Sequence, residues 1–461
     1  MTRITKGTKR DFTRLAHPEP RNLGEAAEHP SPALKGTLSP SDGERDGVRG
    51  RTSIPRSTSI QACASGSLRL ILLPVLIACL GSDVSQGVAA QSDETALCTR
   101  SLVSTGDTTR LQRVLVKARR EETVTVGVIG GSITQGAGAS QPERRYGDLV
   151  AAWWRKTFTK AKIEYVNAGI GATGSDYGAL RAKRDLLSHH PDFVVVEYAV
   201  NDSDSDAAAE TLEGLVRQIL REPNAPAVLL LFTMNQSGGN AQKAHGKVGR
   251  HYDLPMVSFR DALWPEIEQG RMKWGDVEAD VVHPNDRGHA YCAKFIIQVL
   301  ESVLGDVAAG AAMRQIKPTP APLFSDLFEQ VALFEADTLK PVVNQGWTYD
   351  ATQLANRCWK TEQPGSAIEF NIEGRVIVIM DWHIRGPMGQ AKVQVDDLPP
   401  VVREAWFDQT WGGYRMTTVL SRDLKPGQHR VKIQLLSESN PQSTGHEFRL
   451  LGLGVAGMKP R

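Results

Sequence analysis

Five short apolar segments, separated by longer amphipathic ones, are the feature that most constrains the fold of this chain. The five segments are VTVGVI (124–129), IEYVNAGI (163–170), DFVVVEYAV (192–200), AVLLLFTM (227–234) and PMVSF (255–259). Strands that are buried on both faces are short and rich in Val, Ile and Leu in this way. The amphipathic segments between them, such as those at 146–158, 208–222 and 288–304, have the spacing of helices that cover a sheet. This alternation predicts a flavodoxin-like, doubly wound parallel sheet in the α/β class.

The pattern changes after this region. The segment MRQIKPTPAP (313–322) is spaced by prolines, and we interpret residues 311–325 as a linker. Beyond the linker, polar and apolar residues alternate or form short apolar runs; these segments are AIEFNIEG (367–374), VIVIMDWHI (376–384), AKVQVDD (391–397), HRVKIQLL (429–436) and EFRLLGLGV (447–455). Period-two alternation with turn residues between segments predicts an antiparallel β-sandwich over residues 326–461.

The N-terminal part has a different composition. Residues 1–66 are rich in Pro, Gly, Ser and Arg and are predicted to be a disordered, basic leader. The apolar run from Leu70 to Leu80 is shorter than a membrane span and is followed by small residues, which fits a signal peptide cleaved before Gln91. We therefore interpret residues 67–90 as a signal peptide or an uncleaved anchor and expect a secreted or cell-surface protein. Contact with a membrane is expected only through the apolar segment 68–80.

The overall composition is that of a globular protein with more than one domain. The chain has 461 residues, of which 41% are hydrophobic and 23% are charged. Its 54 Lys and Arg nearly balance 52 Asp and Glu, for a net charge of +2. No strongly basic surface is indicated, so we expect no nucleic-acid partner.

A serine lies at the end of the first predicted strand, in the sequence Gly130-Gly131-Ser132. Ligands of open parallel sheets bind beyond the carboxyl ends of the strands, and glycines allow the sharp turn that exposes a following side chain. Ser132 can be a presented nucleophile or simply the cap of the next helix. The GGS sequence by itself leaves both interpretations open.

Other polar clusters follow the same pattern. NAGIGATGS (167–175) and AVND (199–202) lie at the ends of the second and third strands, and DVVHPNDRGH (280–289) precedes the last helix. Because the carboxyl ends of parallel strands meet at one edge of a sheet, these clusters are predicted to converge there. Helix capping alone does not explain such convergence.

With GGSIT (130–134), these clusters form four blocks whose order resembles that of the SGNH/GDSL hydrolase superfamily. NAGIGATGS, AVND and DVVH stand for its glycine, GxND and DxxH blocks, and the resemblance covers about residues 123–304. It implies a hydrolase domain, which we place at residues 91–310. It also implies a serine esterase that needs neither metal nor cofactor.

The resemblance assigns the catalytic roles to three residues. Ser132 is the nucleophile, and His283 takes its proton and returns it to the leaving alcohol. Asp280 accepts the Nδ1 proton of His283 and fixes its tautomer. His245 and His251 lack the spacing of a helical metal pair, and we expect them at the surface or in the substrate cleft.

The same resemblance implies an oxyanion hole with three donors. The Ser132 backbone amide and the Asn201 side chain are two of them, and an amide of the glycine block is the third. Where the family pattern has glycine, five residues after Asn167, this chain has Ala172, preceded by Gly171. Ala172 can supply the amide if its φ is negative. If the turn needs positive φ, the donor is Gly171 or the site is impaired.

The predicted sandwich contains an aromatic segment, REAWFDQTWGGYR (403–415). Trp406, Trp411 and Tyr414 are candidates for stacking on sugar rings, and core filling is the equal alternative. Esterases that act on polysaccharides often join an SGNH domain to a β-sandwich, and the order of domains here is similar to theirs.

We therefore expect an esterase that removes acetyl or another short acyl group from a carbohydrate, so that its partner is an acylated small molecule or polysaccharide. Two alternatives remain. One is an acyltransferase that moves the acyl group to a glycan hydroxyl. The other is a catalytically silent protein that binds a glycan through its sandwich.

Overall fold

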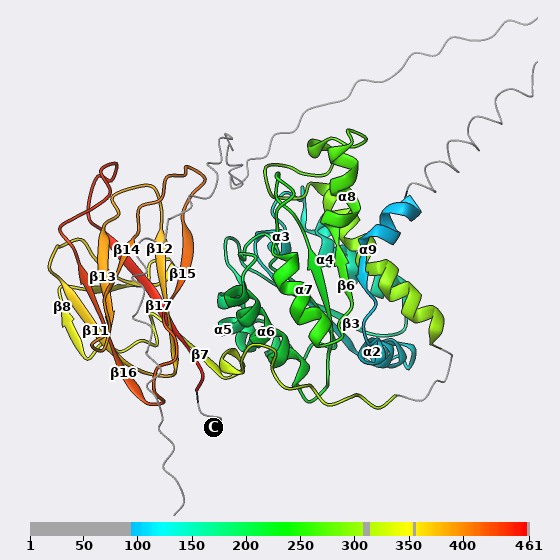
Figure 1. The fold of residues 1–461 in the computed structure, drawn as a ribbon, viewed down its shortest axis with the longest axis horizontal. Helices are drawn as coiled ribbons and strands as arrows, with labels where there is room; N and C mark the ends of the chain where they lie inside the picture. The colour runs from blue at the N-terminus through cyan, green and yellow to red at the C-terminus, as the bar shows by residue number, and fades with distance from the viewer. Residues whose placement is uncertain (1–93, 308–313, 354–355, 459–461) are drawn as a thin grey trace, which may run out of the picture. The chain divides into compact units, whose positions relative to one another are not determined.

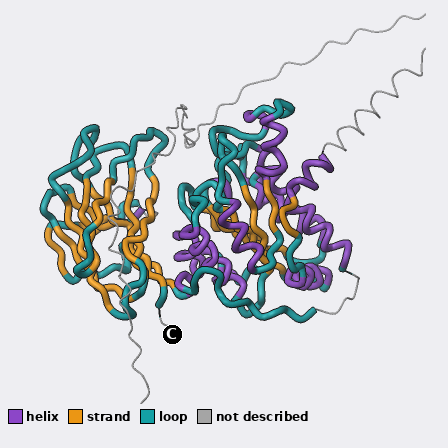
Figure 2. Tube along the Cα trace, viewed as in Figure 1, coloured by secondary structure: helices purple, strands orange, loops and turns teal. Residues whose placement is uncertain are grey.

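The computed structural model describes residues 94–307, 314–353 and 356–458. The predictions for residues 1–66 and 67–90 lie outside these ranges and stay predictions. The described chain has an α/β region followed by an all-β region (Figure 1), and in Figure 2 the helices fall in the first and the second consists of strands and loops. None of the helices in this part of the chain combines the length and apolar character that crossing a bilayer needs.

The first region is built on a six-stranded sheet. Its strands are β1 (Leu102–Ser104), β2 (Val124–Gly130), β3 (Ile163–Gly169), β4 (Phe193–Glu197), β5 (Ala227–Phe232) and β6 (Met256–Ser258). They lie in the order β1-β6-β5-β4-β2-β3, in which β2 to β6 are parallel and β1 is antiparallel to β6. The predicted doubly wound sheet is confirmed. The order reverses between β2 and β4, and this is the point where such sheets bind ligands.

Helices cover both faces of this sheet (Figure 1). They are α2 (Thr109–Arg119), α3 (Ser132–Gln135), α4 (Tyr146–Thr157), α5 (Ser175–Asp185), α6 (Asp206–Leu220), α7 (Gln242–His251), α8 (Phe259–Glu268) and α9 (Asp286–Asp306). Successive side chains of a strand point to opposite faces. In β4, Phe193 and Val195 pack with α2, α4, α8 and α9, whereas Val194 and Val196 pack with α5, α6 and α7. Burial on both faces explains why β2, β4 and β5 are almost wholly apolar.

The second region is an antiparallel β-sandwich. Its strands are β7 (Val331–Glu335), β8 (Val343–Gln345), β9 (Thr348–Asp350), β10 (Cys358–Thr361), β11 (Ala367–Glu373), β12 (Val376–His383), β13 (Gln390–Val395), β14 (Val401–Glu404), β15 (Tyr414–Ser421), β16 (Gln428–Leu435) and β17 (Phe448–Ala456). One sheet has the order β15-β12-β17-β10-β9 with β7 beside β17, and the other has the order β14-β13-β16-β11-β8. Alternate residues of β13 and β16 are buried, as their period-two sequence predicts. The two-layer sandwich is confirmed.

The proline-spaced segment is attached to the α/β region by hydrogen bonds. The buried Glu213 carboxylate on α6 accepts the backbone N–H groups of Leu323, Phe324 and Ser325. The Arg217 guanidinium donates to the Pro320 carbonyl. This part of the chain therefore follows a defined path along α6.

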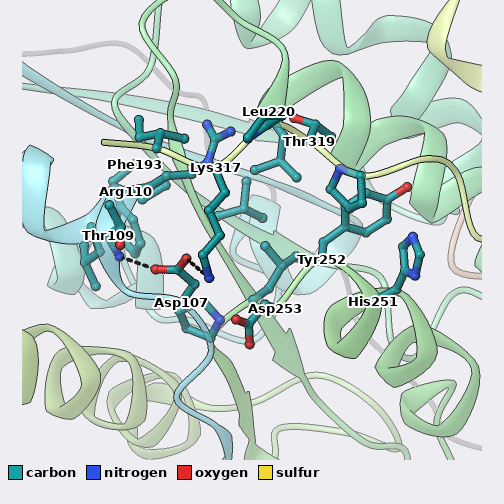
Figure 3. Close-up of a pocket in the computed structure, with 18 residues that line it drawn as sticks. Asp107, Thr109, Arg110, Phe193, Leu220, His251, Tyr252, Asp253, Lys317 and Thr319 are labelled. Carbon is teal, nitrogen blue, oxygen red and sulfur yellow. Dashed lines mark hydrogen bonds and ion pairs between the residues drawn. The ribbon is translucent and has the colours of Figure 1, made fainter. Parts of the chain in front are cut away.

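The same segment closes one side of a cavity of about 230 Å³ (Figure 3). The cavity is lined at the amino ends of β4 and β5 by Phe193 and Ala227, so it lies at the sheet edge opposite Ser132. Asp107 accepts the Thr109 N–H there and forms an ion pair with Lys317 of the proline-spaced segment. These contacts fix the segment on the side of the domain that the nucleophile does not use.

Candidate active site

Ser132 is presented by a turn that only glycine fits. It begins α3 directly after β2, whose seven residues are all buried. A Cβ atom on Gly130 would lie 2.3 Å from the Glu197 carbonyl oxygen, and one on Gly131 would lie 2.1 Å from Asn201 Oδ1. Both contacts are far inside van der Waals distance, so the two glycines allow β4 and Asn201 to approach the nucleophile.

Ser132, His283 and Asp280 form one chain of hydrogen bonds. Ser132 Oγ lies 2.8 Å from His283 Nε2, and His283 Nδ1 lies 2.7 Å from Asp280 Oδ2. The other carboxylate oxygen of Asp280 accepts the backbone N–H groups of Val282 and His283. The structure thus brings together the three side chains that the motifs selected, in the geometry of a nucleophile, a base and a residue that orients the base.

The loop around Asp280 keeps its carboxylate ionised. Partial burial alone would raise its pKa, but the hydrogen bond to His283, the charge of His283 and the two backbone amides outweigh burial, and the net pKa is lowered. The Trp274 ring N–H donates to the Asp280 carbonyl oxygen and fixes the backbone of the same loop. An Asp280 that is ionised at neutral pH can stabilise the imidazolium that forms when His283 takes a proton.

The glycine block adopts a conformation that the sequence left undecided. Ala172 has a φ of 54°, so the condition under which we expected alanine to serve, a negative φ, is not met. The Gly171 N–H, the alternative donor, is already bonded to the side-chain oxygen of Gln135 at 2.8 Å. None of the hydrogen bonds among the described residues uses the N–H of Ser132 or of Ala172. Both amides are therefore free to bind an oxyanion beside the nucleophile.

The comparisons with known proteins agree with this geometry. The model of the GDSL-like lipase/acylhydrolase family matches residues 128–291. A solved two-domain esterase (CEX) active on acetylated mannans is 33% identical to this chain, with a TM-score of 0.73, and the match covers 79% of this chain and 99% of that one. The chain belongs to the GDSL-like lipase/acylhydrolase family.

A second solved structure is similar to this GDSL-like hydrolase to nearly the same extent. A two-domain esterase (CEX) active on acetylated mannans and co-crystallized with mannopentaose is 32% identical, with a TM-score of 0.72 and the same coverage of both chains. No curated protein matches the sequence significantly. The resemblance stated from the four blocks is confirmed, and the GDSL-like hydrolase is a carboxylic ester hydrolase.

His245 occupies a position that the sequence did not predict. We expected it at the surface or in the cleft, but it is buried on α7, and its Nε2 lies 3.0 Å from Asp202 Oδ2. The other oxygen of Asp202 accepts the N–H of Ser175 at the start of α5. Asp202 therefore ties the loop that carries Asn201 to the end of the glycine block. Only the folded chain reveals this contact, because Asp202 and His245 are 43 residues apart.

Two further histidines have structural contacts: His289 beside the site and His251 at the cavity on the opposite edge of the sheet. His289 is fully buried, accepts the Tyr146 N–H at Nδ1 and lies 3.1 Å through Nε2 from the Ala137 carbonyl oxygen. His251 lies with Nε2 2.7 Å from the carbonyl oxygen of Ala321. Neither ring contacts Ser132 or His283 through a hydrogen bond in the described chain.

Two buried carboxyl groups near the GDSL-like site, those of Glu197 and Glu278, were also not predicted from the sequence. Glu197, at the end of β4, is fully buried, and burial raises its pKa to about 7 although the Thr233 and Thr134 hydroxyls bond to it. Glu278, two residues before Asp280, is 3% exposed, and burial together with the Asp280 charge raises its pKa to about 9. Neither carboxylate oxygen of Glu278 has a partner among the described residues.

The three aromatic residues proposed for sugar binding lie in different surroundings. Trp406 is 8% exposed and belongs to the sandwich core, whereas Trp411 is 43% exposed. The rings of Trp411, Phe407 and Tyr414 contact one another, with centroids 4.8 to 5.7 Å apart. The core alternative therefore describes the surroundings of Trp406, while Trp411 and Tyr414 belong to an aromatic cluster in which Trp411 is exposed.

Proposed function

We propose that this GDSL-like hydrolase is a serine esterase that removes acetyl groups from a polysaccharide through an acyl-enzyme. The observation that carries the proposal is the hydrogen-bonded chain from Ser132 Oγ through His283 to Asp280. The acetyl group and the polysaccharide are supported by the two-domain esterase active on acetylated mannans, which is similar over both regions of this chain. Acetylated mannan is therefore the first substrate to examine.

The proposed reaction has two steps. Ser132 Oγ attacks the ester carbonyl carbon while its proton passes to His283 Nε2, and the oxyanion accepts hydrogen bonds from the amides of Ser132 and Ala172 and from Asn201. The C–O bond to the sugar then breaks, and His283 protonates the leaving hydroxyl. Water, deprotonated by His283, attacks the acyl-enzyme, so that acetate leaves and Ser132 recovers its proton.

Acetate release from acetylated mannan tests this proposal. The purified full chain is expected to release acetate in proportion to enzyme concentration and to be labelled covalently by a fluorophosphonate, because both need an activated Ser132. An acetyl-oligosaccharide formed on addition of an unmodified acceptor would identify the acyltransferase alternative instead. A folded protein that neither releases acetate nor takes up the label would be the silent glycan-binding protein.

We further propose that the cluster of Phe407, Trp411 and Tyr414 binds sugar rings of the polymer. Aromatic faces supply flat apolar area, and each well-formed contact is worth about 1 kcal/mol. Trp411→Ala is expected to raise KM for the polymer about fivefold and to leave hydrolysis of p-nitrophenyl acetate unchanged, because the small ester does not reach the cluster.

The matched control for this prediction is Trp153→Ala. Trp153 is a half-buried tryptophan on α4 of the α/β region, and its ring N–H donates to Glu301. The Trp153→Ala variant should have the same KM for the polymer as wild type. Equal KM values for wild type and Trp411→Ala would refute the sugar-binding role of the cluster.

A further inference from the structure

The side chain of Gln135 links the nucleophile turn to the glycine block. Gln135 is the last residue of α3, three positions after Ser132, and its Oε1 accepts the Gly171 N–H at 2.8 Å. Gly171 is adjacent to the nucleophile, because a Cβ placed on it would lie 3.7 Å from Ser132 Cβ and 2.9 Å from Gln135 Oε1. The bond therefore lies directly beside the reacting hydroxyl.

Other bonds hold the glycine block only up to Ile170. Asn167 Nδ2 donates to the Thr134 carbonyl oxygen at 2.9 Å, and the Ile170 N–H donates to the Gly130 carbonyl oxygen at 3.1 Å. After the left-handed turn, the next attachment to another element is the bond from the Ser175 N–H to Asp202. Between these attachments, Gln135 supplies the contact at the residue that immediately precedes Ala172.

That contact matters because Ala172 is in a conformation that alanine rarely adopts. A residue other than glycine in the left-handed region is disfavoured by about 1 kcal/mol or more, so surrounding bonds must hold it there. The Gln135 bond also occupies the Gly171 N–H, which removes one of the two amides that could face the substrate. The N–H groups of residues 172–174 form no hydrogen bond in the described chain, and that of Ala172 is the one next to Gly171 and Ser132.

We propose that Gln135 is a positioning residue: it fixes the strained turn so that the Ala172 N–H, and not the Gly171 N–H, completes the oxyanion hole. This proposal rests on the proposed esterase function. Gln135 itself need not touch the substrate. Its effect is expected on the transition state, where charge develops on the carbonyl oxygen, and hardly on ester binding.

The test uses Gln135→Met, which keeps the length of the side chain but lacks the acceptor. With p-nitrophenyl acetate, kcat is expected to fall about tenfold, with KM within about twofold of wild type, since the misplaced donor weakens only transition-state binding. The affinity for an aryl trifluoromethyl ketone, which forms a tetrahedral adduct with a nucleophilic serine, should fall by the same factor.

A second variant separates positioning from a general structural role. Glycine adopts positive φ without strain, so Ala172→Gly in the Gln135→Met background should restore kcat to within about threefold of wild type. Ala172→Gly alone should change kcat less than about threefold. The proposal is refuted if Gln135→Met keeps full kcat, or if the double variant recovers nothing. A wild type that neither turns over the ester nor takes up a fluorophosphonate would refute the proposed function instead.

Discussion

Ser132→Ala is expected to lower kcat/KM for p-nitrophenyl acetate by about four orders of magnitude or more. The substitution removes only the hydroxyl whose oxygen lies 2.8 Å from His283 Nε2, and no other hydroxyl is bonded to that nitrogen among the described residues. Without the nucleophile no acyl-enzyme forms, and only the weak assistance of the oxyanion donors to direct hydrolysis remains. Initial rates at several ester concentrations measure the loss.

The variant should stay folded, because Ser132 Oγ forms a hydrogen bond in the described chain only with His283. Ser188→Ala is a matched control, since Ser188 is an exposed serine of the same domain whose hydroxyl donates to the Arg184 carbonyl oxygen. Its rate should equal that of wild type. If Ser132→Ala and wild type hydrolyse the ester equally fast, or both take up fluorophosphonate, Ser132 is not the nucleophile.

Glu278→Met is expected to stabilise the protein at neutral and alkaline pH. Burial raises the pKa of Glu278 to about 9 in the folded protein, against an ordinary value of 4.5, so between these values the folded state keeps a proton that the unfolded state releases. The free energy of unfolding therefore decreases as pH rises through this window, by about 3 kcal/mol at pH 7. Methionine does not titrate and places no unpartnered carboxylate oxygen in the buried site, so this pH-dependent loss of stability disappears.

The measurement is thermal or urea unfolding of wild type and variant at several pH values. The two proteins should be similarly stable near pH 4.5, and the advantage of Glu278→Met should grow up to about pH 9. Glu278→Gln also removes the titration and should flatten the pH dependence in the same way. A difference from wild type that is the same at every pH, in both variants, would show that Glu278 is ionised in the folded protein.

The sequence predicted the elements that are buried on both sides. All five apolar segments of the α/β region are strands. β2, β4, β5 and β6 lie inside the sheet, where a parallel strand needs apolar residues throughout, whereas β3 is an edge strand and only partly buried. β1 was not predicted, since its three residues LVS are partly exposed and carry no periodic signal. In the sandwich, β7, β8, β9, β10, β14 and β15 were missed. β8, β9 and β14 are three or four residues long and expose most of their side chains, β10 has only four residues, and β7 and β15 are mostly half-buried. Short edge strands are set by their neighbours in the sheet rather than by their own sequence.

The residues of the site also fall into those that the sequence predicted and those that it did not. Ser132, Asp280 and His283 were selected because their blocks lie at a strand end or before a helix and follow the order of the SGNH/GDSL superfamily. The choice between Gly171 and Ala172 was not decidable, because the φ of Ala172 is imposed by the bonds that hold the loop at both ends. The burial of Glu278 depends on packing around the whole domain, and no local pattern records it.

The alanine at position 172 also affects the enzyme before any ester arrives. Glycine there would sample both left-handed and right-handed backbone basins in the unfolded chain and in local openings, whereas a methyl group excludes many of these states. The energetic penalty of the unusual backbone is therefore incurred once, during folding. Each catalytic cycle then starts from a loop that is already shaped for the developing negative charge, at the expense of some thermal tolerance.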